Sequence, residues 1–410
     1  MTRVSTPRAV VTGVGFACPL GIGTDDVFAR FVAGEDGFRG ERVVDHAVAR
    51  CELDDVAAVM GSKREARRSD RMTHLAVAAA DAAVAHSGID WDRVERDRAG
   101  AVMGTAAGGV TTMVAAVRDL DTRGPDRVSP FLVPMFMPNA LSSTVALRYG
   151  IGGPNFTVVT ACASGANAVG EALQEIRAGR CDVVLAGGSE AATEPVVIAS
   201  FANLGTLTRT GMRPFDLHRD GFAMGEGSAV LVLESEEHAR ARDARILCEV
   251  AGYGCTADAY HMTAPHPDGD GAVRALAMAL DDAGLDPADV GYVNAHGTST
   301  PLNDASEAAA LTRVFGDAVP PVSSTKSMVG HLLGAAGALE AGVTAMALAR
   351  EVLPPTLHYE TPDPAIELDV VPGESRDAKG IDAALSNSFG FGGHNTVLAF
   401  RSEKALGASS

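Results

Sequence analysis

The stretch Val158-Val159-Thr160-Ala161-Cys162-Ala163-Ser164-Gly165 joins a short β-rich run to an Ala/Gly-rich helical stretch, with a cysteine at the junction. At the first turn of a helix, unpaired backbone N–H groups and the positive end of the helix dipole favour an ionised thiol. A lone cysteine is usually a small buried side chain. The strand-to-helix placement instead predicts a tight, exposed turn in which Cys162 is a nucleophile.

Strand-like apolar runs alternate with Ala-rich helical stretches around this junction. The predicted strands are residues 9–13, 99–104 and 182–187, and the predicted helices are residues 73–86 and 165–178. Apolar runs that are bounded by glycine and separated by helices indicate buried, mixed or parallel sheets. The fold class is therefore α/β.

The second part of the chain begins near a strand at residues 246–250 and resembles the first part in its pattern. It contains a strand at 290–294, a helix at 304–315 and a small-residue helix at 332–349. Helices that lack bulky side chains can cross closely between sheets. We expect five αβαβα layers in two duplicated halves, residues 1–248 and 249–410, with the helix starts that carry Cys162 and His331 face to face.

Composition limits the function. The 410 residues are 46% hydrophobic, enough for a large core, and the net charge of -18 disfavours nucleic acid and anionic membranes as partners. No apolar run is long enough to span a membrane, and Met1-Thr2-Arg3 leads into an ordinary strand, so we expect a cytoplasmic protein. The cysteines are scattered without paired spacing, which disfavours disulfides and zinc. They are Cys18, Cys51, Cys162, Cys181, Cys248 and Cys255.

Two histidines are candidates for the same site. His296 follows the strand at 290–294, and ligands bind at strand ends in α/β sheets. The hydroxyl groups of Thr298 and Thr300 could bond an amide-rich substrate arm. His331 precedes the small-residue helix, where it could instead be a packing residue.

Lys326 and Glu340 form a second candidate pair. A lysine at this position is more often solvated, but it could point inward and hold a histidine in place. A buried ammonium or carboxylate without a partner would be costly, so we expect Glu340 to pair with Lys326.

The run Asn387-Ser388-Phe389-Gly390-Phe391-Gly392-Gly393-His394-Asn395 is a glycine-rich turn. It could simply be a hairpin with packed aromatic rings. Flexible glycines around Phe391 also suit a gate, and their backbone N–H groups suit an oxyanion hole.

The motifs ACASG, NAHGTST, KSMVGH and NSFGFGGHN occur in this order over most of the chain. In this they resemble the elongating β-ketoacyl-acyl-carrier-protein synthases of the thiolase superfamily, including the ketosynthases of type II polyketide systems. The runs at 127–155 and 212–227 are also similar to that family. The resemblance implies an acyltransferase with a thiolase-like fold.

The resemblance also implies the role of each site residue. Cys162 would accept an acyl chain from the phosphopantetheine arm of a carrier protein, and no other cofactor would be needed. His296 and His331 would stabilise the enolate formed from malonyl-carrier protein, supported by Lys326 and Glu340. The backbone N–H groups of Cys162 and Phe391 would form the oxyanion hole. The other implied roles are pantetheine or acyl binding by Thr298, Thr300, Ala107, Gly390 and Gly392, and gating by Phe389 and Phe391.

Basic residues are concentrated at residues 63–71 of this acidic chain. Most charge runs are solvated helix faces. Carrier proteins are acidic, however, and the resemblance implies docking here and at one later arginine. The expected docking residues are Lys63, Arg64, Arg67, Arg68 and Arg209.

The sequence departs from the family pattern at two places. Family members that make ordinary fatty acids often carry isoleucine at the position of Ala107, so a wider acyl tunnel is expected. Residues 141–144 are more polar than the usual dimer interface of the family. We therefore favour polyketide or polyene elongation over housekeeping fatty-acid elongation, in a homodimer or in a heterodimer with a chain-length-factor-like subunit.

Other classes fit less well. A non-catalytic chain-length-factor-like subunit would lack the nucleophile, whereas Cys162, His296 and His331 are all present. A priming synthase pairs cysteine with histidine and asparagine, and biosynthetic thiolases end in a different cysteine motif. A papain-like protease using Cys162, His296 and Asn387 disagrees with the α/β pattern.

Overall fold

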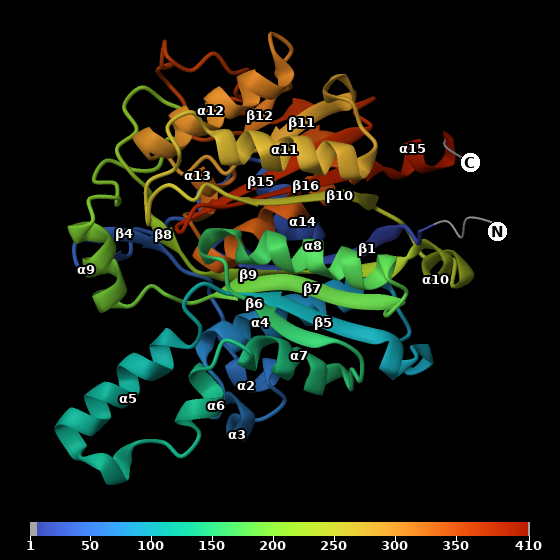
Figure 1. The fold of residues 1–410 in the computed structure, drawn as a ribbon. Helices are drawn as coiled ribbons and strands as arrows, with labels where there is room; N and C mark the ends of the chain where they lie inside the picture. Colours follow the sequence, from blue (N-terminus) through green and yellow to red (C-terminus); the bar gives the residue numbers. More distant parts are fainter. Residues whose placement is uncertain (1–5, 409–410) are drawn as a thin grey trace.

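The computed structural model describes residues 6–408 and has a mixed α/β architecture built on one eleven-stranded sheet (Figure 1). The expectation for Met1-Thr2-Arg3 lies outside the described residues. The strand order is β12-β11-β15-β16-β10-β1-β9-β7-β5-β6, and β2 pairs with β1 beside this path. The strands are β1 (Ala9–Cys18), β2 (Gly21–Gly23), β5 (Ala99–Gly104), β6 (Asn155–Val158), β7 (Val183–Glu190), β9 (Gly227–Ser235), β10 (Cys248–Ala257), β11 (Val290–Asn294), β12 (Val322–Ser323), β15 (Ala383–Gly390) and β16 (His394–Ser402).

The sheet consists of two halves with the same pairing pattern. In the first half, β5 is parallel to β6 and β7, and β7-β9-β1 continue antiparallel. In the second half, β11 is parallel to β12 and β15, and β15-β16-β10 continue antiparallel. Among the described strands, a short antiparallel pairing of β1 with β10 joins the two halves of the sheet, from Ala9 opposite Val250 to Val11 opposite Cys248. The expected duplication is confirmed, and we propose the division at residue 248 because β10 begins there.

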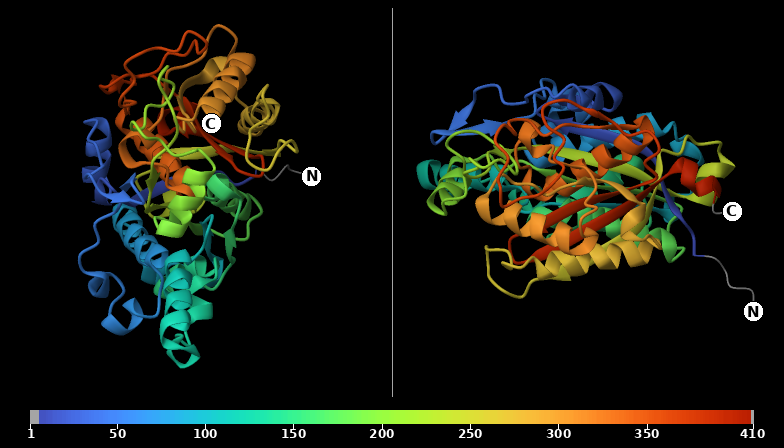
Figure 2. Two further views of the ribbon diagram at one scale, coloured as in Figure 1. Left: turned by 90° about the vertical axis from the view of Figure 1, so that its left-hand side faces the viewer. Right: turned by 90° about the horizontal axis from the view of Figure 1, so that it is seen from above.

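Helices cover and separate the two halves, which gives five layers (Figures 1 and 2). The outer face of the first half is covered by α4 (Arg71–Ser87) and α7 (Ala140–Tyr149). The outer face of the second half is covered by α11 (Asp270–Ala283), against which α12 (Pro301–Phe315) packs. Between the halves lie α8 (Ser164–Arg177) and α14 (Ala336–Arg350), and both contact strands of both halves.

The two central helices cross closely at a point where each carries a glycine. A Cβ atom on Gly165 would lie 2.7 Å from the backbone nitrogen of Ala338, and one on Gly337 would lie 2.7 Å from the backbone nitrogen of Ala166. No larger residue fits at either position without moving a helix. The close crossing predicted from the small-residue composition is confirmed, and it brings the starts of α8 and α14 together.

The predicted elements are present, but β1 and β10 extend five and seven residues beyond the predicted ends at 13 and 250, and α12 begins three residues before the predicted 304. Strands β5 and β11 have the predicted bounds, and α4 and α8 differ from their predictions by one or two residues at each end. The predicted helix at 332–349 begins later, at Ala336, because a tight 3-10 turn at Leu333–Ala335 precedes it. This turn is part of the site described below.

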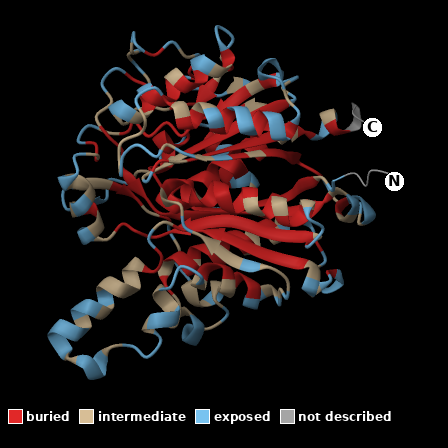
Figure 3. Cartoon of the chain, viewed as in Figure 1, coloured by how far each residue is buried: buried red, intermediate tan, exposed pale blue. Residues whose placement is uncertain are grey.

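One region projects from the layered body. It contains α5 (Val110–Arg123) and α6 (Leu132–Phe136), and Figures 1 and 2 show α5 as an arm standing away from the sheet. No residue of either helix is buried, in contrast to the central strands and helices (Figure 3). Along the described chain, no helix is long and apolar enough to cross a membrane.

The remaining elements are short and lie around the layered body. They are α1 (Asp25–Val32), α2 (Val56–Val59), α3 (Lys63–Ala66), α9 (Pro195–Asn203), α10 (Glu236–Ala241), α13 (Lys326–Val329), α15 (Glu403–Ala408), β3 (Arg42–Val43), β4 (His46–Ala49), β8 (Met224–Gly225), β13 (Val352–Leu353) and β14 (Arg376–Asp377).

Candidate active site

The cysteine lies in a strained turn between β6 and α8. Cys162 is the middle residue of a 3-10 turn at Ala161–Ala163, and Ala161 has a left-handed φ of 50°. This conformation is unfavourable for a residue with a Cβ atom, so neighbours must hold it. The Ser164 hydroxyl donates to the carbonyl of Ala161 at 2.6 Å and accepts from the N–H of Thr160 at 2.8 Å. The turn is therefore fixed by the first residue of the helix.

The expectation of an exposed, acidified thiol is wrong for the resting protein. Cys162 is 9% exposed and packs in a small apolar cluster with Leu333 and Ala106. Burial raises the pKa of the thiol to about 12, opposed by the charge of Lys326 and by a hydrogen bond from the backbone N–H of Phe391. Residues far along the chain cover the sulfur, which the local motif could not reveal.

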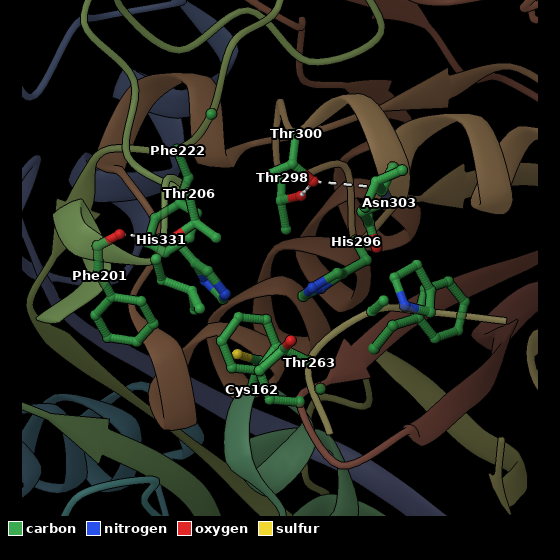
Figure 4. Close-up of a pocket in the computed structure, with 18 of the residues that line it drawn as sticks. Cys162, Phe201, Thr206, Phe222, Thr263, His296, Thr298, Thr300, Asn303 and His331 are labelled. Atoms are coloured by element: carbon green, nitrogen blue, oxygen red, sulfur yellow. Dashed lines mark hydrogen bonds between the residues drawn. The ribbon is translucent and has the colours of Figure 1, made fainter. Parts of the chain in front are cut away.

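The two histidines converge on the cysteine, as predicted. His296 follows β11, and His331 forms an isolated parallel bridge with Met224. Their ring centroids are 5.4 Å apart in an edge-to-face arrangement. Figure 4 shows the two rings approaching from opposite sides above Cys162.

Both imidazoles are neutral at rest. Burial lowers the pKa of each ring well below its ordinary value, and the positive charge of Lys326 lowers it further. Nδ1 of each ring is buried without a hydrogen-bond partner among the described residues, so Nε2 is the nitrogen available to a molecule in the pocket. Two neutral rings can each donate one N–H bond there.

The predicted pair of Lys326 and Glu340 is confirmed. Both side chains are 1% exposed, and Lys326 Nζ donates to Glu340 Oε1 in a short contact. Burial raises the pKa of Glu340 to about 7, and the ammonium of Lys326 opposes that rise. The pair places a positive charge near both imidazoles and the thiol.

A second buried carboxylate, Glu307, was not predicted. Its Oε1 accepts from the backbone N–H of His296 at 2.9 Å, and its Oε2 accepts from that of Gly297 at 2.8 Å. Asn387 Nδ2 donates to the same carboxylate at 3.0 Å. Glu307 therefore holds the loop that carries His296. In the sequence, Glu307 appears as a single acidic residue in the Ala-rich stretch of α12, which does not by itself indicate this contact.

The glycine-rich segment approaches the 3-10 turn at Ala161–Ala163 that carries Cys162. A Cβ atom on Gly390 would lie 2.9 Å from the carbonyl of Thr160 and 3.1 Å from the backbone nitrogen of Cys162. Phe389 packs edge-on against His296, with ring centroids 5.8 Å apart. Phe391 packs against Phe201, a residue that sequence reasoning missed, at 6.1 Å.

These residues line one cavity of about 390 Å³. Cys162, His296 and His331 are at its base, and Thr298 and Thr300 line its wall (Figure 4). The hydroxyl groups of these threonines are 2.9 Å apart. Gly390 and Phe391 also line the cavity, whereas Gly392 does not. Lining residues that sequence reasoning did not single out include Phe201, Phe222, Leu333 and Asp258.

Ala107 does not line the cavity in the single chain. It is exposed, and its backbone N–H donates to Glu190 Oε1 at 3.2 Å. Its neighbour Ala106 packs in the cluster with Cys162 instead. The expectation of direct acyl contact by Ala107 is thus not met within one chain, because the loop turns this side chain outward.

The expected docking residues lie in two separate places. Lys63, Arg64 and Arg67 are exposed on and beside α3, and the Arg68 guanidinium stacks on Phe131 at 4.1 Å from the ring centroid. Arg209 is exposed beyond α9, and its backbone N–H donates to Asp220, which lines the cavity. Figure 1 shows α3 and α9 well apart, so one chain does not combine all five residues into a single patch.

The site offers acyl-transfer chemistry. A thiol lies beside two N–H-donating imidazoles in a cavity that is large enough for an extended substrate arm. Within residues 6–408, no group of three or more His, Cys, Asp or Glu side chains is arranged to hold a metal ion.

Comparison with known proteins gives a consistent picture. Residues 6–239 match the family model of the β-ketoacyl synthase N-terminal domain, and residues 247–360 match that of the C-terminal domain. The 3-oxoacyl-[acyl-carrier-protein] synthase 2 of Synechocystis sp. is 44% identical over 414 residues, which covers 98% of this chain and 99% of the relative.

Two solved structures are also similar. The ishigamide ketosynthase/chain length factor has a TM-score of 0.91 at 35% identity, covering 97% of this chain and 100% of that chain. A type II PKS ketosynthase, in complex with its acyl-carrier protein and bound to the hexaketide, has a TM-score of 0.89 at 33% identity, with 97% and 100% coverage.

The fold and the Cys-His-His cavity define an acyltransferase of the ketosynthase class. The chain belongs to the β-ketoacyl synthase family.

Proposed function

We propose that this chain elongates acyl groups on a carrier protein by decarboxylative condensation. Cys162 holds the growing acyl chain, and malonyl-carrier protein supplies two carbons. The observation that carries this proposal is the meeting of Cys162, His296 and His331 at the base of one cavity. A non-catalytic subunit of the chain-length-factor type would not need this constellation.

In the first half-reaction, the Cys162 sulfur attacks the thioester carbonyl of an acyl-phosphopantetheine. A C–S bond forms, and the oxyanion is held by the backbone N–H groups of Cys162 and Phe391. The oxyanion then collapses, the pantetheine C–S bond breaks, and the thiol proton leaves with the pantetheine sulfur.

In the second half-reaction, the malonyl C–C bond breaks and carbon dioxide leaves. The resulting enolate oxygen accepts N–H bonds from His296 and His331, which are neutral and shielded from water. The enolate carbon attacks the acyl carbonyl on Cys162, and the C–S bond to Cys162 breaks. The departing thiolate takes up one proton from solvent as the product leaves. The product is a β-ketoacyl chain that is two carbons longer.

The phosphopantetheine arm arrives on the carrier protein, and we propose no other cofactor. Its amide groups would contact the Thr298 and Thr300 hydroxyls on the cavity wall. The proposed docking residues on the carrier protein's path are Arg209 near the cavity mouth and the group at Lys63–Arg68, which would attract an acidic partner.

Acyl transfer to the protein tests this proposal directly. Wild-type protein is mixed with acyl-carrier protein, and its intact mass is measured. We expect one acyl group on Cys162, none on Cys162→Ala, and normal loading of Cys255→Ala, in which an exposed cysteine is removed. Absence of an acyl group on the wild type, or its presence on Cys162→Ala, would refute the assignment.

The pathway is a finer proposal. The similar structures include a type II PKS ketosynthase bound to a hexaketide, which supports extension of polyketide or polyene chains. The relative named 3-oxoacyl-[acyl-carrier-protein] synthase 2 supports ordinary fatty-acid elongation instead. Turnover of saturated, unsaturated and β-keto acyl-carrier proteins separates them, and a strict preference for saturated chains would overturn the polyketide proposal.

We also propose that the chain works as a dimer in the cytoplasm, either with itself or with a chain-length-factor-like subunit. Strand β6 lies at one edge of the sheet, and the projecting region nearby exposes Val117 and Leu120 of α5 and Val133 of α6 at 49%, 46% and 57%. Open strand edges and apolar patches are typical of contact surfaces. Light scattering of Leu120→Lys against wild type tests the dimer, because the charge should shift the purified protein towards monomer.

A further inference from the structure

Beyond the residues already assigned, the nucleophile turn is held by one buried amide. Asn167 lies on α8, one turn beyond Ser164, and is 2% exposed. Its Nδ2 donates to the hydroxyl oxygen of Thr160 at 2.7 Å. Thr160 is the residue directly before the strained Ala161-Cys162 pair.

The same amide is anchored from the other half of the molecule. Asn167 Oδ1 accepts from the Tyr253 hydroxyl at 2.6 Å and from the Thr396 hydroxyl at 2.8 Å. Tyr253 belongs to β10 and Thr396 to β16, so both donors come from the second half of the sheet.

The tyrosine ring is itself tightly placed. A Cβ atom on Gly170 would lie 2.4 Å from Cδ2 of Tyr253, so the ring lies directly against the backbone of α8. A side chain at position 170 would displace the ring and its hydroxyl. The geometry leaves Asn167 little freedom, because both of its polar atoms are bound by side chains from separate elements.

We infer that Asn167, held by Tyr253 and Thr396, is a positioning residue that fixes the nucleophile turn so that the Cys162 N–H points at the reacting carbonyl. The inference rests on the proposed acylation of Cys162. Three observations support it: the left-handed φ of Ala161, the bond from Asn167 to the preceding Thr160, and the two anchors from the opposite half.

If Asn167 positions the turn, its loss should slow two reactions of the Cys162 sulfur to different extents. Transfer of an acyl group passes through an oxyanion and needs the Cys162 N–H in place. Alkylation by iodoacetamide forms a C–S bond with loss of iodide and has no oxyanion. A misplaced turn should therefore slow acyl transfer far more than alkylation.

The test uses full-length Asn167→Leu, which removes all three bonds at similar size, and Tyr253→Phe, which removes one. We expect acyl transfer from acyl-carrier protein to slow about tenfold or more in Asn167→Leu and about threefold in Tyr253→Phe, with unchanged KM. Alkylation rates should stay within about threefold of wild type. The matched control is Tyr149→Phe, which removes a hydroxyl that donates to Asp81 on the outer face at 2.6 Å.

Wild-type acyl transfer in both variants would overturn the inference, and so would parallel losses of acyl transfer and alkylation, which indicate a general structural role. If Asn167→Leu does not fold, Tyr253→Phe alone decides. Failure of the proposed function is distinguishable, because wild-type Cys162 would then take up no acyl group from the carrier protein.

Discussion

The starts of the two central helices are built alike and serve different purposes. Before α8, the 3-10 turn at Ala161–Ala163 begins with Ala161 at a φ of 50°, and before α14, the turn at Leu333–Ala335 begins with Leu333 at a φ of 46°. Cys162 in the first turn thus corresponds to Gly334 in the second. The two halves supply two strained turns, and the first carries Cys162, the proposed nucleophile.

The two turns also differ in what binds their backbone N–H groups. The N–H of Gly334 donates to the buried carboxylate of Glu190 at 3.1 Å. At Cys162, the backbone nitrogen faces Gly390, where an added Cβ atom would lie 3.1 Å away. The second turn is held by the carboxyl group of Glu190, and we propose that the first keeps its N–H for the oxyanion of the reaction.

The largest effect should come from removing either histidine while leaving the turn that carries Cys162 intact. His296→Ala and His331→Ala should each lower condensation about 100-fold or more, because each removes one donor to the enolate. Acyl loading of Cys162 should fall much less. Loading is followed by intact mass, and condensation by release of labelled carbon dioxide from malonyl-carrier protein. Equal losses in both steps would show that the two turns do not divide the work.

Breaking the buried ion pair should have the next largest effect. Lys326→Met leaves Glu340 buried and unpaired, which should cost about 3–5 kcal/mol of unfolding free energy. Urea denaturation measures this cost. The double variant Lys326→Met/Glu340→Leu should recover much of the unfolding free energy, but its condensation rate should stay below that of the wild type. A stable single variant would contradict the pairing.

A side chain at position 390 should block the space beside the Cys162 N–H. Gly390→Ala places a methyl group 3.1 Å from the Cys162 nitrogen, so acyl transfer should slow about 10- to 100-fold. Ser388→Ala on the same strand is the control, since it removes a hydroxyl without adding bulk. Stopped-flow quenching and mass measurement give both rates. Unchanged transfer in Gly390→Ala would place the oxyanion elsewhere.

A smaller effect is expected in the pH dependence of stability. The folded-state pKa values of His296 and His331 lie well below the unfolded value of about 6.5. The unfolded state therefore binds more protons below pH 6.5, and the unfolding free energy should fall as the pH decreases from there. His331→Asn should reduce this slope by up to about 1.4 kcal/mol per pH unit, measured by urea denaturation. An unchanged slope in His331→Asn would contradict this contribution.

Local patterns were sufficient to predict the layers and the convergence of Cys162, His296 and His331. Alternating apolar runs and Ala-rich helices are local features, and the small residues of 165–170 and 334–338 already indicated a close helix crossing. Cys162, His296 and His331 each follow a strand or precede a helix, so their placement at one edge could be inferred.

What the sequence left hidden depends on contacts between distant segments. Cys162 is buried in a cluster that includes Phe222 and Leu333, and it accepts a hydrogen bond from the backbone N–H of Phe391, all of which lie far along the chain. The outward turn of Ala107 depends on Glu190, whose carboxylate binds the backbone of Ala106 and Ala107. Glu190 and Glu307 were missed because a single acidic residue gives no local sign that it faces backbone N–H groups.

The most direct measurement follows one acyl group through a single turnover. Wild-type protein loaded at Cys162 is mixed with malonyl-carrier protein, and the masses of both proteins are recorded together with released carbon dioxide. We predict that acyl-Cys162 disappears as carbon dioxide and the longer β-ketoacyl-carrier protein appear in equal amounts. Carbon dioxide release without consumption of acyl-Cys162, or loss of the acyl group by hydrolysis alone, would contradict condensation at this site.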